Sequence, residues 1–402
     1  MLAANEDILF KITEFLLDRS IIYLTMTCKK FDTLKYKFIY REKVCVEKIS
    51  YLSYFDNFEC VELKYLTDPR PKCARYVHFN TGETDIPNFV THLMIDAAVP
   101  STTHVTVPAG VTDFTLHGHD SATISPTVTY LNLMSNVKID IPDSVTKLSI
   151  GGIHDICDFH YSIPSSVKYM KLYYGQGDAS NYIPSSVKKL KLLTSSMIKT
   201  PSSVTHLSIM FGTNAVLDYS FIPSVTHLKI TSYCNVTFLN SEHSHVTHLV
   251  NRIYLGSHHI LKHLPPQLTH LTFGVGFDQP IVSALPDSLI HLTFEGPYQY
   301  SINDNMAPSL TCIRFGPDFE SYDNLPSTVT HIEIGYGFDT ILPNFPANVT
   351  HLTLGSYFNL PLKDLSLTIT DLNLSERYYH PISDEITKRV NITRTRYRLP
   401  EC

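Results

Sequence analysis

Apolar and polar positions repeat along most of this chain with a period of about twenty residues. In each copy an apolar anchor is followed by Thr, as a rule, and by apolar residues at positions +3 and +5. Side chains alternate along a strand, so +3 and +5 share one face while +2 and +4 share the other. Each copy therefore predicts a short strand with one buried and one outward face. The fifteen anchors are Val90, Val111, Val128, Val145, Val167, Val187, Val204, Val225, Val246, Leu268, Leu289, Leu310, Val329, Val349 and Ile369.

Proline marks the start of most copies. It stands three residues before the anchor in ten of them, for example at Pro142, Pro164 and Pro184. Its fixed φ and missing N–H end one coil and begin the next strand. One such unit cannot bury its apolar edge alone, whereas stacked units form a parallel sheet with a continuous core. We predict a β-rich solenoid of about fifteen rungs of about twenty residues.

The apolar positions 0, +3 and +5 resemble the leucine-rich-repeat pattern L-x-x-L-x-L. Several copies continue as Gly-x-x-Phe-Asn/Asp and then x-Pro, most clearly from Gly355 to Pro361. Together with Ile-Pro-Ser-Ser-Val and Thr-His-Leu, this phrase is similar to the FNIP repeat. The similarity spans about residues 86–375. It implies a protein of social amoebae or of giant viruses that infect them, and it names no ligand.

The first forty residues follow a helical pattern instead. Asn5 can cap a helix with an acidic first turn, and the apolar residues from Ile8 to Leu16 fall on one helical face. A break at Asp18-Arg-Ser20 precedes a second apolar run that ends at Phe31. We predict a small α-helical module. One interpretation of it is a helical cap on the first rung, since terminal repeats need polar or helical covers.

The same stretch resembles the F-box, although Ala4-Asn5 replaces the usual Leu-Pro and Ser20 replaces Asp. An F-box ahead of repeats implies a substrate receptor of an SCF-type cullin-RING ubiquitin ligase. By this resemblance, a Skp-family adaptor would be bound by Ile8, Leu9, Ile12, Phe15, Leu16, Ile21, Leu24, Cys28 and Phe31.

The predicted organisation has four parts. Residues 1–44 form the F-box-like helical module, and 45–85 are a connector or degenerate N-terminal rungs. Residues 86–375 are the solenoid, and 376–402 are a C-terminal cap.

Composition and charge narrow the class of partner. Charged residues make up 17% of the chain, Trp is absent, and the formal net charge is −6. Such a chain has no general attraction to nucleic acid or to an anionic membrane. The eight cysteines include no Cys-x-x-Cys pair, and no segment reaches eighteen uninterrupted apolar residues. We expect a soluble cytoplasmic protein, in the host cytoplasm if it is viral.

Eight of the twenty histidines occupy the single position +2. On adjacent parallel strands they would stack every 4.7–4.9 Å or so on the outward, concave face. One interpretation is a surface that binds a target protein; the other is a structural ladder on a solvated sheet. The predicted target-binding residues are His206, His227, His248, His270, His291, His331, His351, Lys171, Lys191 and Lys229.

Chemistry beyond binding has little support in the sequence. The clusters around His117-Gly-His119 and His243-Ser-His245 have no Cys or carboxylate set that would complete a metal site. The outward acids Asp113, Glu333 and Asp371 are too far apart to act as a glycosidase pair. We expect no enzyme and no cofactor. The alternatives to a ligase receptor are an interaction scaffold or decoy and, with less support, a carbohydrate-binding solenoid.

Overall fold

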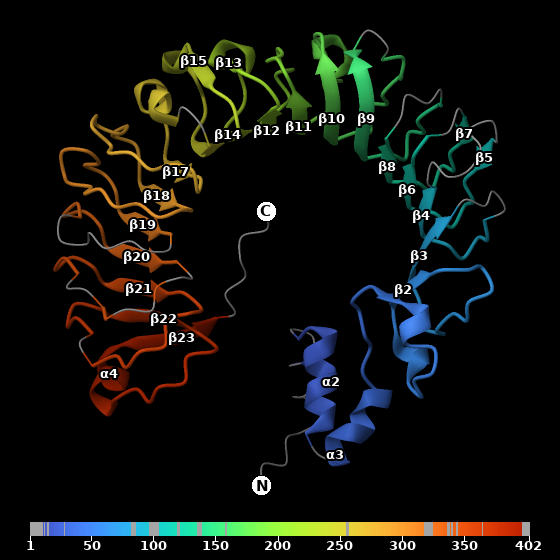
Figure 1. The fold of residues 1–402 in the computed structure, drawn as a ribbon, viewed down its shortest axis with the longest axis horizontal. Coiled ribbons are helices and arrows are strands. Elements are labelled where there is room, and N and C mark those ends of the chain that lie inside the picture. Colours follow the sequence, from blue (N-terminus) through green and yellow to red (C-terminus); the bar gives the residue numbers. More distant parts are fainter. Residues whose placement is uncertain are drawn as a thin grey trace. The chain divides into compact units, whose positions relative to one another are not determined.

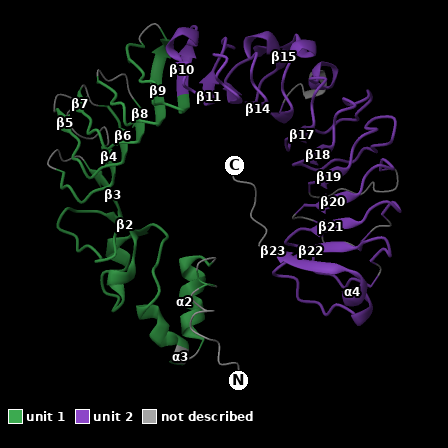
Figure 2. Cartoon of the chain, turned by 180° about the vertical axis from the view of Figure 1, so that it is seen from behind, with its two compact units in different colours: residues 1–171 green, residues 172–402 purple. Residues whose placement is uncertain are grey.

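The structure is a computed structural model with two compact units, residues 1–171 and 172–402 (Figure 2). It describes residues 11, 13, 16–27, 29–81, 86–95, 104–118, 121–134, 139–156, 159–254, 257–316, 325–335, 338, 341–342, 345–363 and 365–395. Within these ranges no helix has the length and apolarity needed to cross a membrane.

Unit 1 begins with helices and continues as a stack of short strands (Figure 1). Its main strands pair in parallel in the order β1–β2–β3–β4–β6–β8–β9, and β5 pairs separately with β7. The elements are α2 (Asp18–Met26), α3 (Lys29–Asp32), η1 (Thr33–Tyr36), β1 (Val44–Cys45), η2 (Val46–Lys48), η3 (Phe55–Asn57), β2 (Cys60–Leu63), β3 (Tyr76–Thr81), β4 (His92–Ile95), β5 (Val105–Thr106), β6 (Asp113–Leu116), β7 (Ala122–Thr123), β8 (Tyr130–Leu133) and β9 (Lys147–Asp155).

Unit 2 continues the same architecture, and β10 (Tyr169–Gln176) spans the boundary. Its main strands pair in parallel from β11 to β23, with the separate pair β13–β15. The elements are η5 (Ser180–Tyr182), β11 (Lys189–Thr194), β12 (His206–Phe211), β13 (Ala215–Asp218), η6 (Tyr219–Phe221), β14 (His227–Ser232), β15 (Val236–Leu239), η7 (Ser241–His243), β16 (His248–Ile253), η8 (Ser257–His263), β17 (His270–Phe273), β18 (His291–Phe294), β19 (Cys312–Phe315), β20 (His331–Ile334), β21 (His351–Leu354), β22 (Asp371–Ser375), α4 (Asp384–Arg389) and β23 (Asn391–Thr395).

The strands stack in register, so each slot of the repeat faces the same slot of the next rung. On β12 and β14, His206 pairs with His227 and Leu207 with Leu228. Positions +3 and +5 are buried, as the alternation predicts, and the anchor Val204 is fully buried. Burying such a side chain contributes about 1.5–3 kcal/mol. The predicted parallel, leucine-rich-repeat-like solenoid is confirmed.

The turns before the strands follow the proline pattern. The carbonyl of Pro201 accepts a hydrogen bond from the backbone N–H of the anchor Val204 at 3.0 Å. In the same way, the carbonyls of Pro265 and Pro326 accept hydrogen bonds from the backbone N–H groups of the anchors Leu268 and Val329. Proline is suited to this place because only its carbonyl is needed there.

The Gly-x-x-Phe phrase fits two close packing requirements. A Cβ on Gly335 would lie 2.8 Å from the carbonyl oxygen of Phe315 on the preceding rung. Phe338 and Phe358 each lie three residues after the glycine of their own copy. Both are buried, and their ring centroids lie 6.0 Å apart. Glycine therefore allows the coil to approach its neighbour, and the phenylalanines continue the core beyond the strands.

The break predicted at Asp18-Arg-Ser20 lies slightly earlier, at Leu16 and Leu17, and α2 begins at Asp18. The carboxylate of Asp18 accepts hydrogen bonds from the backbone N–H groups of Arg41 and Glu42, at 3.0 and 2.7 Å. The Asp18 N–H in turn donates to Glu42 Oε2 at 3.0 Å. Asp18 is an acidic residue in the first turn, which suits the helix dipole, and its tertiary contacts join the start of α2 to the segment before β1.

Side-chain hydrogen bonds also join α4 to the coil that precedes β22. Guanidinium N–H groups of Arg389, at the end of α4, donate to the carbonyls of Leu365, Ser366 and Ile369 at 2.9–3.2 Å. The planar fork of arginine suits several acceptors at once. Arg389 thus satisfies carbonyl groups of the coil before β22, and β23 is the last strand among the described residues.

One rung places a polar residue in the core. Asn251 occupies position +5 of β16, is 2% exposed, and its side-chain Nδ2 and Oδ1 have no hydrogen-bond partner among the described residues. In the sheet it lies between Ile230 and Phe273. An unpaired buried amide costs about 1–3 kcal/mol.

We therefore expect Asn251→Leu, which keeps the branched skeleton, to stabilise unit 2 by about 1–3 kcal/mol. Thermal unfolding followed by circular dichroism measures the shift. The converse change at the neighbouring rung, Ile230→Asn, should lower the melting temperature. Equal melting temperatures for Asn251→Leu and the unmodified chain would contradict the expectation.

Candidate functional site

Five histidines form an uninterrupted stack on the outward face of unit 2. This histidine column consists of His206, His227, His248, His270 and His291, each the first residue of its strand. Neighbouring ring centroids lie 4.1–4.3 Å apart and the ring planes differ by 11–13°. The stacking predicted from the slot +2 is thus present in β12, β14, β16, β17 and β18.

The threonine at +1 fixes the orientation of each of the first four rings. Thr226 Oγ1 lies 3.0 Å from His227 Nδ1, and its hydroxyl donates to the carbonyl of Thr205 at 3.3 Å. The same pair of contacts occurs at His206, His248 and His270. A hydroxyl has one proton, and where this proton goes to the carbonyl, Nδ1 is the donor to Oγ1. Nε2 then carries a lone pair on the outward edge of the ring.

The fold favours the neutral form of three of these rings, those of His206, His248 and His270. Burial, and next the charges of neighbouring imidazoles, lower the pKa of His248 below its ordinary value and that of His270 to about 4. Burial and His227 also lower the pKa of His206. These three rings are therefore polar groups that accept hydrogen bonds rather than positive charges.

Parallel rings do not make a metal site. The lone pairs of stacked imidazoles run side by side and do not converge on one ion, as tetrahedral zinc ligands must. Within the part of the chain that the structure describes, no group of three or more His, Cys, Asp or Glu could hold a metal.

Position +4 adds cations beside the column. Lys191, Ser208 and Lys229 lie in one row across β11, β12 and β14, and Lys189 precedes His206 in the row of the column. Further along, Arg252 on β16 reaches over Gly274 to Glu295, with Nε–Oε2 and Nη2–Oε1 distances of 2.8 and 2.5 Å. This bidentate pair neutralises the arginine.

Beyond His291 the column is interrupted by Cys312 on β19 and resumes at His331 and His351, whose rings lie 4.0 Å apart. The outward acids are all paired. Asp113 lies 3.5 Å from His92, Glu333 lies 3.5 Å from Arg314, and Asp371 lies 3.4 Å from His351. Each carboxylate thus has its own basic partner, which does not suit a pair of acid and base catalysts.

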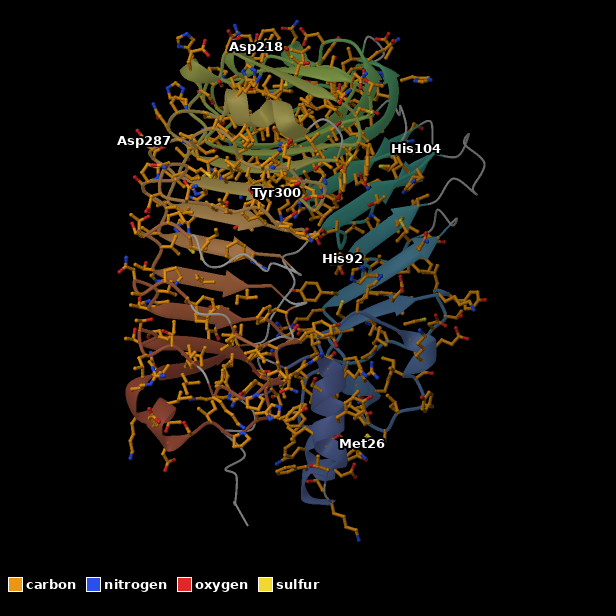
Figure 3. All side chains as sticks on the ribbon, turned by 60° about the vertical axis from the view of Figure 1, so that its left-hand side comes forward. Met26, His92, His104, Asp218, Asp287 and Tyr300 are labelled. Carbon is orange, nitrogen blue, oxygen red and sulfur yellow. The ribbon has the colours of Figure 1, made fainter. Side chains whose placement is uncertain are left out.

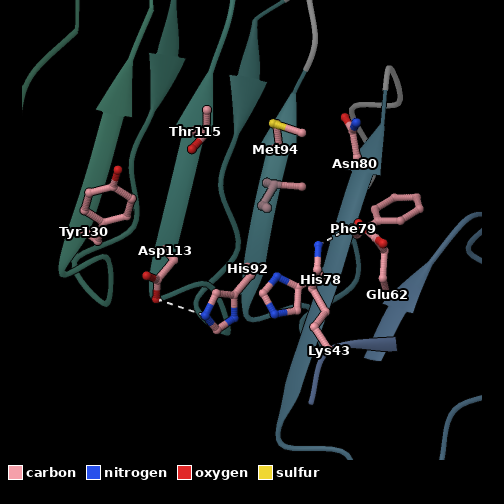
Figure 4. Close-up of a pocket in the computed structure, with 11 residues that line it drawn as sticks. Lys43, Glu62, His78, Phe79, Asn80, His92, Met94, Asp113, Thr115 and Tyr130 are labelled. Atoms are coloured by element: carbon pink, nitrogen blue, oxygen red, sulfur yellow. Dashed lines mark hydrogen bonds and ion pairs between the residues drawn. The ribbon is translucent and has the colours of Figure 1, made fainter. Parts of the chain in front are cut away.

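Unit 1 has a hollow of about 220 Å³ on its outward face, lined by both polar and apolar side chains (Figure 4). Its lining includes His78, His92 and Asp113, together with the ion pair Lys43–Glu62 at 3.0 Å. The rings of His78 and His92 lie 4.2 Å apart. Their planes differ by 34°, so the two histidines on β3 and β4 are in contact but are not stacked in parallel as in the column.

Cys60 lies beside this hollow, with its Sγ 3.4 Å from His78 Nε2. Burial raises the pKa of the Cys60 thiol and lowers the pKa of His78 to about 4. Both shifts favour the neutral thiol and the neutral imidazole, whereas a catalytic cysteine requires the thiolate. The geometry suits a polar contact better than a nucleophile.

The predicted adaptor-binding residues are only partly within the described chain. Ile8, Leu9, Ile12, Phe15 and Cys28 lie outside the described residues. Ile21 is 3% exposed, and Leu16, Leu24 and Phe31 are half-buried. Outward apolar groups on α2 are instead Tyr23 and Met26, which are 54% and 71% exposed; Met26 is labelled in Figure 3.

Sequence reasoning did not single out Lys43, Glu62 and His78 around the hollow or the pair Arg252–Glu295. The strands β2 and β3 lack the Pro and Thr of the repeat, and only the alternation of Val61 with Leu63 and of Val77 with Phe79 marks them. The pair Arg252–Glu295 forms across Gly274, which lies on the rung between them. All three residues occupy position +6 of their copies, so a comparison of this position across the copies would have found the pair. Lys171, also predicted as target-binding, lies with its Nζ 5.6 Å from the ring centre of Tyr169.

Residues 258–296 match the FNIP Repeat family, and this range contains β17 and β18 of the histidine column. No curated protein matches the chain.

Two solved structures are similar over most of the chain. The crystal structure of CroV588, described as a novel circular LRR protein, has 19% identity and a TM-score of 0.43, with 88% of this chain and 68% of that chain covered. The crystal structure of the mouse RP105/MD-1 complex has 14% identity and a TM-score of 0.38, with 87% and 65% covered.

The tautomer of the column can be measured directly. We expect ¹⁵N-labelled His206, His227, His248 and His270 to show a protonated Nδ1 and an unprotonated Nε2 at pH 7, because Thr Oγ1 can only accept from Nδ1. Nitrogen chemical shifts distinguish the two forms. Replacing Thr247 by Val should abolish the preference at His248 and leave His227 unchanged. Protonated Nε2 signals would contradict the assignment.

The lowered pKa values also predict acid sensitivity. A histidine with a folded pKa below its unfolded value of 6.5 stabilises the fold above pH 6.5, and this stability is lost as the pH falls towards about 4. We expect the melting temperature to fall over this range, and to fall less in His270→Thr. The exposed His245→Thr is the matched control. An identical pH profile for His270→Thr and the unmodified chain would contradict this origin.

Proposed function

We propose that this protein is a receptor that holds a target protein on the outward face of unit 2 and brings it to a partner through its N-terminal helices. The observation that carries the first part is the histidine column, whose rings are already fixed by stacking and by threonine. A binding surface ordered in advance loses little conformational entropy when its partner binds.

The shape of this surface favours a macromolecule. Small ligands prefer concave, mostly apolar pockets. The column is a row of ring edges along successive strands, and two hollows described in unit 2 are lined by other segments, around Asn214–Thr237 and around Leu362–Arg389. A protein partner can contact several rungs at once, and a repeat array supplies such an extended surface.

The second part of the proposal concerns a Skp-family adaptor of an SCF-type ubiquitin ligase. It is supported by the F-box-like pattern and by the apolar surface of α2, where Tyr23 and Met26 lie one turn apart. Exposed apolar groups this close together are typical of protein contacts. The Asp18–Glu42 contacts would hold the module in place while the adaptor binds.

The test is a binding measurement between the full-length protein and a purified Skp-family adaptor. We expect the double variant Tyr23→Asp with Met26→Asp to weaken adaptor binding by about tenfold or more, since a charge would be placed in an apolar contact. Both side chains are exposed, so the fold should remain intact by circular dichroism.

The matched control is Val282→Asp with Ile341→Asp, two apolar residues of unit 2 that are 82% and 77% exposed. It should bind the adaptor as the unmodified chain does. If the unmodified protein fails to bind any Skp-family adaptor, the ligase role is excluded. The N-terminal helices are then an end cap, and the chain is an interaction scaffold or decoy.

A further inference from the structure

Two tyrosines form a stacked pair just beyond the ends of β14 and β16. Tyr233 and Tyr254 each follow the last residue of their strand, and their ring centroids lie 4.6 Å apart, with 9° between the ring planes. The ring of Tyr254 extends over the next rung, where a Cβ on Gly276 would lie 3.2 Å from its Cδ1 atom. The glycine therefore leaves room for this ring. Tyr233 is 63% exposed, so its own ring can be reached from solvent.

The free face of Tyr233 lies toward a rung that has no side chain at the same level. Strands β12 and β14 pair in register up to Phe211 and Ser232, so Gly212 and Tyr233 come next on their two rungs. A Cβ on Gly212 would have no heavy atom within 4 Å beyond its chain neighbours, and Ser195 stands at this level on the rung of β11. Parallel strands lie about 4.8 Å apart, close to the separation of the two tyrosine rings. The space over Gly212 between Tyr233 and Ser195, which we call the stacking gap, thus has the width for one more flat ring.

A hollow of about 570 Å³ continues from the stacking gap along β13. Its lining includes Ser195 beside the gap, Asn214 and Asp218 along the β13 segment, and Phe221 beyond it. Strand β13 has four residues, and each adds about 3.3 Å, so the hollow is about 13 Å long. Because Phe221 is exposed, an accessible aromatic ring lies at either end, Tyr233 at one and Phe221 at the other.

The length of one repeat copy explains why this hollow exists. The anchors Val187 and Val204 are 17 residues apart, whereas Val204, Val225 and Val246 follow one another at intervals of 21. The two longer copies form β13 and β15, which pair with each other. In the short copy the described residues 195–200 form no strand beside β13. The hollow lies between the start of this segment and β13.

Two polar side chains of the hollow keep groups with which a ligand can form hydrogen bonds. The side-chain oxygen of Asn214 accepts a hydrogen bond from the backbone N–H of Asn235 at 3.1 Å, which leaves its NH2 group as a donor. Asp218 accepts three hydrogen bonds from Ser220 and Asn240 at 2.7–2.9 Å, all of them on Oδ1. Its Oδ2 is left as an acceptor.

We infer that the stacking gap and the hollow bind a neutral oligosaccharide, with one pyranose ring stacked on Tyr233 and the following rings along β13. The axial C–H groups of a glucose-type ring carry partial positive charge and match the negative face of the tyrosine ring. Sugar hydroxyls both donate and accept, so they suit the amide of Asn214 and the carboxylate of Asp218. The site lies beyond the ends of the strands, whereas the histidine column lies at their starts. The inference therefore goes beyond the proposed function and does not depend on it.

Other classes of ligand fit these groups less well. The described lining contains Asp218 and no Lys, Arg or His, which disfavours nucleotides and other phosphates. Arg252, two residues before Tyr254, already binds Glu295. Proline-rich peptides dock in grooves lined by several aromatic side chains. Here the two tyrosines stack on each other and offer a single free face.

The experiment uses the full-length protein with cellotetraose and chitotetraose, two neutral chains whose rings carry equatorial substituents. Saturation-transfer NMR titrations measure the dissociation constants. Tyr233→Ala should weaken binding by about tenfold, because it removes the stacking face. Gly212→Leu fills the stacking gap and should weaken binding to a similar degree, while the open space around Gly212 lets the fold persist. Circular dichroism checks that both variants are folded.

The control Tyr379→Ala removes another exposed tyrosine of unit 2, which is 74% exposed, and should bind as the unmodified chain does. Glucose, which can fill only the stacking gap, should bind at least about tenfold more weakly than cellotetraose. Equal affinities for Tyr233→Ala, Gly212→Leu and the control would overturn the inference. So would tighter, Tyr233-dependent binding of adenosine monophosphate or of an oligoproline peptide, or no binding of either sugar chain at about 10 mM.

Discussion

In-register hydrogen bonding between parallel strands is the constraint on which the rest of this structure depends. Once His206 pairs with His227 and Leu207 with Leu228, every slot of the repeat becomes a column at the strand spacing. Apolar residues at equivalent positions of successive rungs pack against one another and form the core, and polar residues at equivalent positions lie side by side on the surface. A residue type that recurs in one slot is thereby turned into an extended feature, whatever its role in a single rung.

Threonine shows how the backbone and the surface are linked. Its hydroxyl donates to a carbonyl of the preceding rung, and its oxygen accepts from the imidazole beside it. The same side chain therefore contributes to rung stacking and to the orientation of the ring edge. Where Ile290 replaces threonine, His291 keeps its place in the stack but loses this contact.

The repeat made much of the fold predictable, because period, strand alternation and proline position all depend on local sequence. The column at +2 was predictable for the same reason. Features that join different rungs were not predictable from the local sequence. Asp18 binds the backbone of Arg41 and Glu42, and Arg252 reaches Glu295 across Gly274. The hollow of unit 1 was also missed, because β2 and β3 keep the alternation of the repeat without its proline and threonine.

The glycine at the end of the strand has an implication for how such a chain can change over generations. Gly335 lies so close to the carbonyl of Phe315 that this rung fits its neighbour through a contact of backbone with backbone. Backbone is the same in every rung. A duplicated or deleted rung would therefore meet an acceptable neighbour on both sides, and whole coils can be gained or lost by unequal recombination while the outward side chains diversify one rung at a time.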